Sequence, residues 1–103
     1  MVRTPRVAPV HGLKEQRETQ VKLLYFAWVR QKTGIAEEEI AAPSSVTTVA
    51  ALVDFLRGRG PGYEAAFRDL KLLRVAVNRQ HHGFDAPVGP DDEVAFFPPV
   101  TGG

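Results

Sequence analysis

The hydrophobic residues of the chain follow a helical period in one stretch. Over residues 47–60 the apolar side chains recur at positions i, i+3, i+4 and i+7, which predicts an amphipathic helix. Thr48 or Thr47 is its expected N-cap, and Gly58 or Gly60 its expected C-terminal end. The apolar positions of this helix are Val49, Leu52, Val53 and Leu56.

Strand formers cluster or alternate with polar residues elsewhere in the chain. The pattern predicts strands over residues 21–28, 37–42 (a weaker one stopped by Pro43), 72–78 and 93–97. A helical turn is expected to end at Gly34, another lies within residues 62–70, and residues 79–92 are rich in turns. One helix can cover only one face of such a sheet, so we expect the other face to be exposed and polar.

Strand alternation assigns each side chain to one of the two faces. The core-facing positions are Val21, Leu23, Tyr25, Ala27, Leu73, Val75, Val77, Val94 and Phe96. The outward positions are Lys22, Leu24, Phe26, Trp28, Leu72, Arg74, Ala76, Asn78, Glu93, Ala95 and Phe97. Phe26 and Phe97 thus lie on a face that also carries Lys22 and Glu93. Exposed aromatic residues rimmed by charge predict a protein partner, unless loops cover them.

Composition limits the classes of function. The 103 residues, 44% hydrophobic and 24% charged, fit one globular domain. A domain this small has little room for a deep active site, which counts against a self-contained enzyme. A net charge of +1 gives no global attraction to nucleic acid or an anionic membrane, and no cysteine is present for a disulfide or thiolate site.

The first 20 residues carry two prolines, one glycine and mixed charge without a regular period. We therefore interpret residues 1–20 as a mobile extension. The alternative is a basic presequence, which Glu15 and Glu18 disfavour because acidic residues are unusual in transit peptides. No apolar stretch approaches the roughly 20 residues of a membrane span, and the N-terminus lacks a secretory signal, so we expect a cytoplasmic protein.

The sequence ends in DEVAFFPPVTGG. Pro98 and Pro99 cannot donate to a strand ladder, so an extended tail, residues 98–103, follows the last strand. Six residues can span roughly 20 Å, and Gly102 and Gly103 have no Cβ to obstruct a narrow channel. The carboxylate of Gly103 is ionised at neutral pH. It therefore needs activation, most simply as an acyl-adenylate made by an ATP-dependent partner.

Four segments carry a resemblance to a known family. VKLLYFAWVRQKTG, TTVAALVDFL, KLLRVAVN and DDEVAFFPPVTGG resemble, in order and spacing, the small sulfur-carrying subunits of molybdopterin synthases, in the ubiquitin-like MoaD/ThiS family. The resemblance covers about residues 21–103. It implies an α+β, ubiquitin-like β-grasp domain, with a mixed sheet and one main helix packed on one face.

The resemblance also implies a function. The C-terminal Gly103 would be adenylated, converted to a thiocarboxylate, and would donate sulfur to cyclic pyranopterin monophosphate in molybdenum cofactor biosynthesis. The chain would bind no cofactor and would not be catalytic alone; the large synthase subunit, in a heterotetramer, and an adenylating enzyme that uses ATP would be its partners. Thr101 and Gly102 would line the threaded tail, and Phe26 and Phe97 would bind the partner.

One position departs from the family pattern. His81 stands in the partner surface where the family often has an apolar residue. His81 and His82 face opposite ways in an extended chain and have no third ligand nearby, so we predict no metal site. The acidic runs 37–39 and 91–93 are interpreted as solvated turns and strand ends, although Asp92 and Glu93 are candidates for contacting basic groups of a partner.

Three other functions stay open at this point. The chain can be a sulfur carrier for thiamine synthesis or tRNA thiolation, a ubiquitin-like protein modifier, or a plain interaction domain with an idle tail. The basic residues of the extension do not predict nucleic-acid binding, because no aromatic residues interleave with them. These basic residues are Arg3, Arg6, Lys14 and Arg17.

Overall fold

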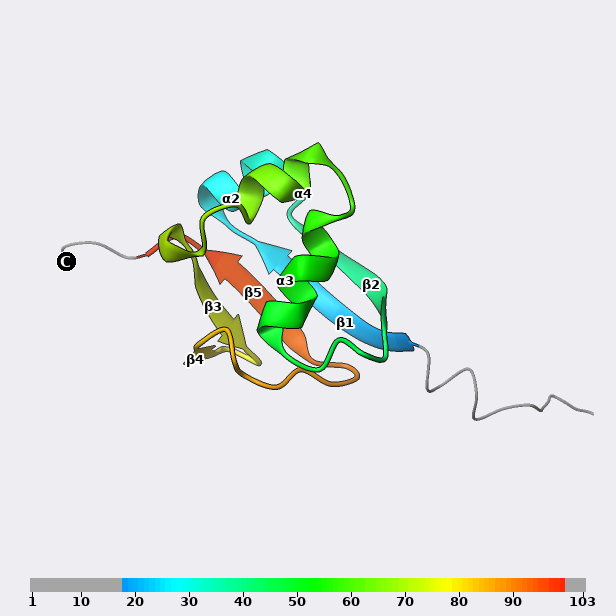
Figure 1. Ribbon diagram of the computed structural model, residues 1–103. Coiled ribbons are helices and arrows are strands. Elements are labelled where there is room, and N and C mark those ends of the chain that lie inside the picture. Colours follow the sequence, from blue (N-terminus) through cyan, green and yellow to red (C-terminus); the bar gives the residue numbers. More distant parts are fainter. Residues whose placement is uncertain (1–17, 100–103) are drawn as a thin grey trace, which may run out of the picture.

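The computed structural model describes residues 18–99, and residues 1–17 and 100–103 lie outside the described part. Within residues 18–99 the chain forms five strands, three α-helices and one 3-10 helix (Figure 1). The strands are β1 (Glu18–Tyr25), β2 (Glu37–Pro43), β3 (Arg74–Val77), β4 (Gln80–His82) and β5 (Glu93–Phe97). The helices are α2 (Ala27–Thr33), α3 (Val49–Arg57), α4 (Pro61–Ala66) and the 3-10 helix η1 (Leu70–Leu72).

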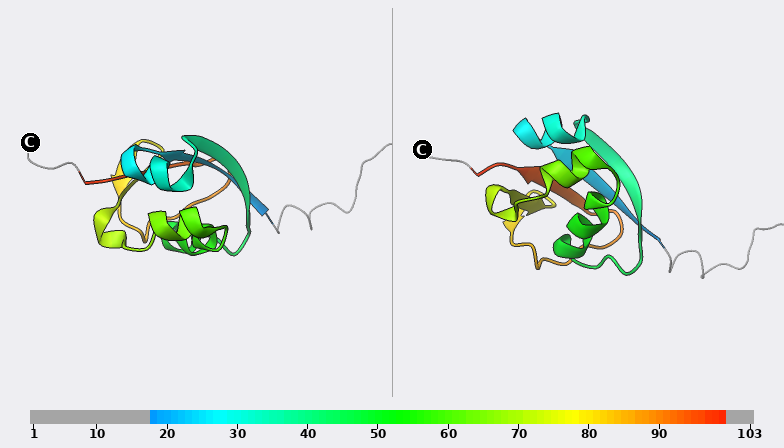
Figure 2. Two further views of the ribbon diagram at one scale, coloured as in Figure 1. Left: turned by 90° about the horizontal axis from the view of Figure 1, so that it is seen from above. Right: turned by 45° about the horizontal axis from the view of Figure 1, so that its top comes forward.

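The strands form one mixed sheet in the order β2-β1-β5-β3-β4. β1 and β5 run parallel at its centre, and the other neighbours are antiparallel. Figure 2 shows α3 and α4 together over one side of the sheet. This arrangement confirms the predicted α+β, β-grasp fold. None of the helices in residues 18–99 is long and apolar enough to cross a membrane.

The core lies between the sheet and α3. The four apolar positions predicted for this helix are all buried, and Thr48 Oγ1 accepts a hydrogen bond from Ala51 N at 3.2 Å, as expected of an N-cap. Gly58 occupies the C-cap. At one end of the core, the Tyr25 ring stacks on Phe96 at 6.3 Å and Phe67 meets Phe96 edge-on at 4.8 Å. The core-facing predictions are confirmed except at Ala27.

The first strand differs from its prediction at both ends. It begins at Glu18, so residues 18–20 pair with β2 instead of belonging to a mobile extension. It ends at Tyr25 because Ala27 has a positive φ of 54°, which breaks the ladder and starts α2. Ala27 is consequently exposed, and Trp28 is half-buried against the core rather than outward as predicted.

The turn-rich region contains a strand that the sequence did not predict. Asn78 and Arg79, with φ of 51° and 71°, form a two-residue turn between β3 and β4. The third strand is also shorter than expected, because Leu72 belongs to η1, where the Asp69 carboxylate accepts a hydrogen bond from Lys71 N at 3.0 Å. Leu72 therefore does not share a strand face with Arg74.

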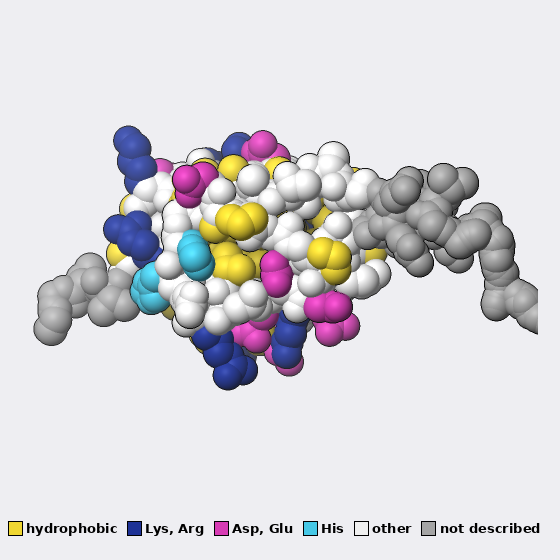
Figure 3. Space-filling model, turned by 90° about the horizontal axis from the view of Figure 1, so that it is seen from below, with side chains coloured by type: hydrophobic (Ala, Val, Ile, Leu, Met, Phe, Trp, Pro, Cys, Tyr) yellow, Lys and Arg dark blue, Asp and Glu magenta, His cyan; other side chains and the backbone are white. Residues whose placement is uncertain are grey.

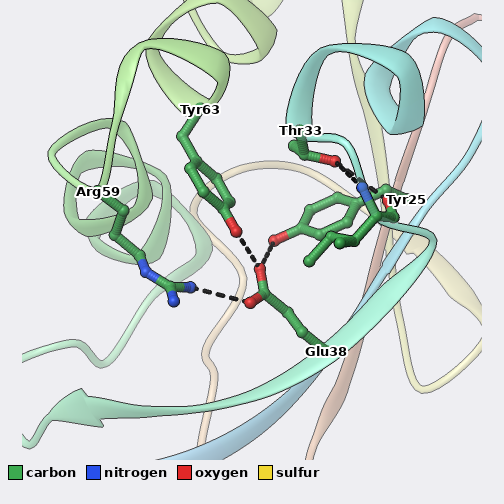
Figure 4. A network of polar contacts seen from close by, with 6 residues as sticks. Tyr25, Thr33, Glu38, Arg59 and Tyr63 are labelled. Carbon is green, nitrogen blue, oxygen red and sulfur yellow. Dashed lines mark hydrogen bonds and ion pairs between the residues drawn. The ribbon is translucent and has the colours of Figure 1, made fainter.

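A partly buried carboxylate links β2 to β1 and α4 (Figure 4). Glu38 Oε2 accepts hydrogen bonds from the hydroxyls of Tyr25 and Tyr63, both at 2.8 Å, and its Oε1 accepts one from Arg59 Nη1 at 3.2 Å. Only 15% of the Glu38 side chain is exposed. The interpretation of residues 37–39 as a solvated run is therefore wrong for Glu38, which shares the inner side of β2 with Ile40.

Candidate functional site

Within residues 18–99, no helix lies over the sheet face opposite α3 and α4 (Figure 2); we call it the open face. Strand register places one row of five outward residues across it. Ala76 and Ala95 are small, and Leu24 is half-buried, so the middle of this row is a flat apolar floor. From β4 to β2 the row is His81, Ala76, Ala95, Leu24 and Glu37.

The aromatic side chains of Phe26, His81 and Phe97, which we call the aromatic group, close one end of this floor. The His81 and Phe97 rings meet edge-on with centroids 5.3 Å apart. Phe26 N donates a hydrogen bond to Phe96 O at 3.1 Å, which holds Phe26 beside the end of β5 with 48% of its surface exposed. The structure thus brings the three predicted partner-binding residues, Phe26, His81 and Phe97, into the lining of one shallow depression of about 510 Å³. Whether a partner binds there stays a prediction.

Charged side chains of both signs surround the depression. In register, Lys22 lies between Glu39 of β2 and Glu93 of β5. Arg79 Nε lies 3.7 Å from Glu93 Oε2. Figure 3 shows histidine, hydrophobic and acidic side chains close together on the neighbouring side of the molecule. A flat apolar centre with an ionic rim is the composition of a protein–protein interface.

The tail begins at the aromatic end of the open face. The β5 ladder ends at Phe97, as Pro98 and Pro99 predicted, and both prolines are half-buried. Thr101, Gly102 and Gly103 lie outside the described residues, so their predicted roles in tail threading and sulfur transfer stay predictions.

Tyr25, which lies next to the aromatic group, has a raised pKa. Burial, reinforced by the hydrogen bond and the negative charge of Glu38, raises the pKa of Tyr25 well above its ordinary value. The Tyr25 hydroxyl therefore stays protonated and keeps donating to Glu38 even above about pH 10, where a free tyrosine ionises. Because Tyr25 directly precedes Phe26 and stacks on Phe96, which precedes Phe97, this network fixes the backbone that presents both aromatic residues.

Neither histidine of β4 belongs to a cluster of possible metal ligands. His81 pairs with Ala76 and His82 with Val75, so the two side chains leave opposite faces of the strand. Across residues 18–99 no three His, Cys, Asp or Glu side chains are grouped closely enough to hold a metal ion. Asp92, a candidate for a partner contact, instead accepts hydrogen bonds from Asn78 Nδ2 at 3.0 Å and Gly89 N at 2.8 Å.

Sequence reasoning missed Arg79 as part of the rim. This residue fell in the region interpreted as irregular, so alternation could not assign it to a face. The available signal was Asn78, a residue that tolerates positive φ, standing between Val77 and the polar run that became β4.

Sequence comparison and structure comparison both relate this chain to sulfur carriers and molybdopterin-converting factors. The family model of the ThiS family matches residues 23–103. The molybdopterin synthase sulfur carrier subunit of Escherichia coli (strain K12) is 45% identical over 83 residues, which are 81% of this chain and 99% of that protein.

Two solved structures extend the comparison. A putative molybdopterin converting factor, subunit 1, from Pyrococcus furiosus has a TM-score of 0.66 at 32% identity, covering 80% of this chain and 99% of that chain. A chain from a complex of subunits 1 and 2 of the molybdopterin-converting factor of Helicobacter pylori 26695 has a TM-score of 0.57 at 20% identity, covering 82% and 100%, and supports the fold alone. The match over residues 23–103 and the 45% identity show that the chain belongs to the ThiS family.

Proposed function

We propose that this chain is the sulfur carrier subunit of a molybdopterin synthase and supplies sulfur in molybdenum cofactor biosynthesis. The observation that carries the proposal is the position of Phe26, His81 and Phe97, which line one depression beside the strand end from which the tail departs. The 45% identity to a carrier of this kind supports it. A protein that accepts the tail would meet these three side chains at the same time.

The chemistry resides in the carboxylate of Gly103. Its oxygen attacks the α-phosphorus of ATP on an adenylating enzyme, pyrophosphate leaves, and an acyl-adenylate forms. A donor of sulfide-level sulfur then displaces AMP at the acyl carbon and leaves a thiocarboxylate. This sulfur replaces an oxygen substituent on a carbon of cyclic pyranopterin monophosphate: the C–S bond forms as that C–O bond breaks, and the oxygen leaves as water or with the opened phosphate ester. Water then hydrolyses the acyl–sulfur bond, which returns Gly103 to a carboxylate and leaves the sulfur on the pterin. Two carriers in succession supply the two sulfur atoms of the dithiolene.

The chain's own contribution is binding and delivery. The open face docks on the large synthase subunit, where Phe26 and Phe97 are the apolar anchors and His81 packs against Phe97. Thr101 and Gly102 line the threaded tail, and the lack of a Cβ at Gly102 suits a narrow channel. Two carriers and two large subunits form a heterotetramer. The chain is not catalytic alone, binds no cofactor, and works in the cytoplasm, where its adenylating partner finds ATP.

The test is reconstitution. The chain, its adenylating enzyme, ATP, a sulfide donor and the large subunit should convert cyclic pyranopterin monophosphate to molybdopterin. Gly102→Ala should slow this conversion through its added methyl group. Gly58→Ala is the matched control, because Gly58 has a φ of −80° and its new Cβ would meet only Phe55 O, at 3.6 Å. Absence of conversion, together with isopeptide-linked adducts in lysate, would favour the protein-modifier alternative instead.

A further inference from the structure

Exposed hydrophobic side chains mark a second surface near the tail. Among the described residues, the exposed large hydrophobic side chains are Phe26, Ile35 and Leu72, with 48%, 37% and 53% of their surface exposed. Phe26 belongs to the open face. Leu72 lies in η1, two residues before Arg74, and Arg74 pairs with Phe97 at the end of β5. The most exposed of the three is therefore close to the start of the tail but outside the open face.

Leu72 forms one wall of a groove on the helical side of the molecule. The groove holds about 320 Å³ and lies between α2, the end of α4 and η1. Trp28, Ala65 and Leu72 give it an apolar lining. Figure 1 shows α2 and η1 at the end of the molecule where β5 finishes, and Figure 2 shows the same from two other directions.

The rim of the groove is mainly basic. Lys32 and Arg68 line it together with a single acid, Asp69. Asp69 Oδ1 already accepts a hydrogen bond from Lys71 N at 3.0 Å, and two basic residues against this one acid leave the rim with a net positive charge. The Arg68 side chain is 71% exposed, and its contact with Glu64 is long, at 3.8 Å. The groove therefore suits an apolar side chain flanked by carboxylates.

We propose that this groove is a second docking surface for the large synthase subunit, which inserts into it a large apolar side chain flanked by Asp or Glu. The inference rests on the proposed function. Phe26 caps α2 and Trp28 is the second residue of that helix, so the aromatic end of the open face and the lining of the groove adjoin each other. A protein that encloses an extended tail starting at Pro98 contacts both sides of its starting point.

The other occupants fit the groove less well. The segment of this chain before β1, residues 1–17, has one acidic residue, Glu15, and four basic residues, Arg3, Arg6, Lys14 and Arg17. Its positive charge has the same sign as that of the rim, which would repel it. A second copy would have to bring an acidic apolar segment. The two most acidic segments are residues 37–39 and 91–93. Glu38 is already bound by two tyrosines and an arginine, Asp92 accepts hydrogen bonds from Asn78 and Gly89, and Glu93 pairs with Arg79.

The experiment measures the affinity of the purified large subunit for the chain and three variants by calorimetry. Leu72→Asp should weaken binding about tenfold or more, because it places a charge in an apolar contact. Lys32→Glu combined with Arg68→Glu should weaken it several-fold and flatten its dependence on salt. Ile35→Asp is the matched control, an exposed hydrophobic residue outside the groove, and should bind like the unmodified chain. Circular dichroism checks folding, and Leu72→Ser replaces Leu72→Asp if the latter unfolds.

Phe97→Asp separates the failure of this inference from the failure of the proposed function. If Phe97→Asp weakens binding while the groove variants bind normally, the inference is overturned and the proposed function stands. If the unmodified chain does not bind the large subunit at all, both fail. If sedimentation finds a dimer of the chain that Leu72→Asp dissociates, while that variant still binds the large subunit normally, the occupant is a second copy and the inference is overturned.

Discussion

Replacing Glu38 with alanine should destabilise the domain more than a single substitution on an edge strand usually does. The substitution removes the acceptor of three hydrogen bonds, from Tyr25, Tyr63 and Arg59. Tyr25 is only 1% exposed, so its hydroxyl would be left without a partner, at a cost of about 1–3 kcal/mol. Tyr63 is half-buried and can turn to water, which lowers its cost to about 1 kcal/mol. The partly exposed pair with Arg59 adds at most about 1 kcal/mol.

The expected loss is therefore roughly 2–5 kcal/mol, most of it from the orphaned Tyr25 hydroxyl. A loss of about 3 kcal/mol would lower the melting temperature of a domain of this size by about 12–24 °C. Adding Tyr25→Phe to Glu38→Ala removes the orphaned hydroxyl. The double variant should consequently be about 1 kcal/mol more stable than Glu38→Ala alone.

Urea unfolding of the unmodified chain, the two single variants and the double variant closes a thermodynamic cycle. Glu38→Gln is the conservative control, because its amide oxygen can still accept from a tyrosine and it should lose less than Glu38→Ala. A loss below about 0.5 kcal/mol for Glu38→Ala, or a double variant no more stable than Glu38→Ala, would refute the reasoning.

Three further predictions concern the open face and the tyrosine beside it. Phe97→Asp should weaken binding of the large subunit about tenfold or more, yet cost about 1 kcal/mol of folding free energy or less, because the Phe97 side chain is half-buried. Calorimetry measures the binding and urea unfolding the stability, and an unfolded variant would contradict the outward assignment of Phe97. His81→Leu should bind at least as tightly by calorimetry, because it extends the apolar floor beside Phe97, and a marked loss would instead reveal a specific contact of the imidazole. Burial and Glu38 raise the pKa of Tyr25, so above about pH 10 the unfolded chain releases a phenol proton that the folded chain keeps. Because of this one group, the free energy of unfolding falls by about 1.4 kcal/mol for each further pH unit. Tyr25→Phe should remove that part of the slope in urea unfolding from about pH 9 to 11, and an unchanged slope would exclude Tyr25 as its source.

The sequence predicted the parts of the fold that depend on local pattern. The helical spacing in α3 and its Thr48 cap hold because one face of that helix packs on the sheet. β5 ends at Phe97, where the pattern and Pro98 agree. The outward assignments of Phe26 and Phe97 follow from the two-residue period alone, and that period is sufficient to place two residues of the candidate site on the same face.

The remaining features depend on backbone geometry and tertiary contacts. The apolar run over residues 21–28 gave no signal for the positive φ of Ala27, so the start of α2 was interpreted as strand. β4 was missed because its three residues are all exposed and leave no hydrophobic alternation. Glu38 was within reach of alternation, which groups it with Ile40. Its acidic neighbours nevertheless favoured a solvated interpretation, and its partner Tyr63 is 25 residues away.

The central claim is that Gly103 carries sulfur, and intact-protein mass spectrometry tests it most directly. The chain is incubated with ATP, its adenylating enzyme and a sulfide donor, beside a variant with one residue added after Gly103. The account predicts that one oxygen is replaced by one sulfur in the unmodified chain, at the C-terminal residue on fragmentation. The extended variant should stay unchanged. A variant that gains sulfur with its added residue still present, or an unmodified chain that gains none, would contradict the account.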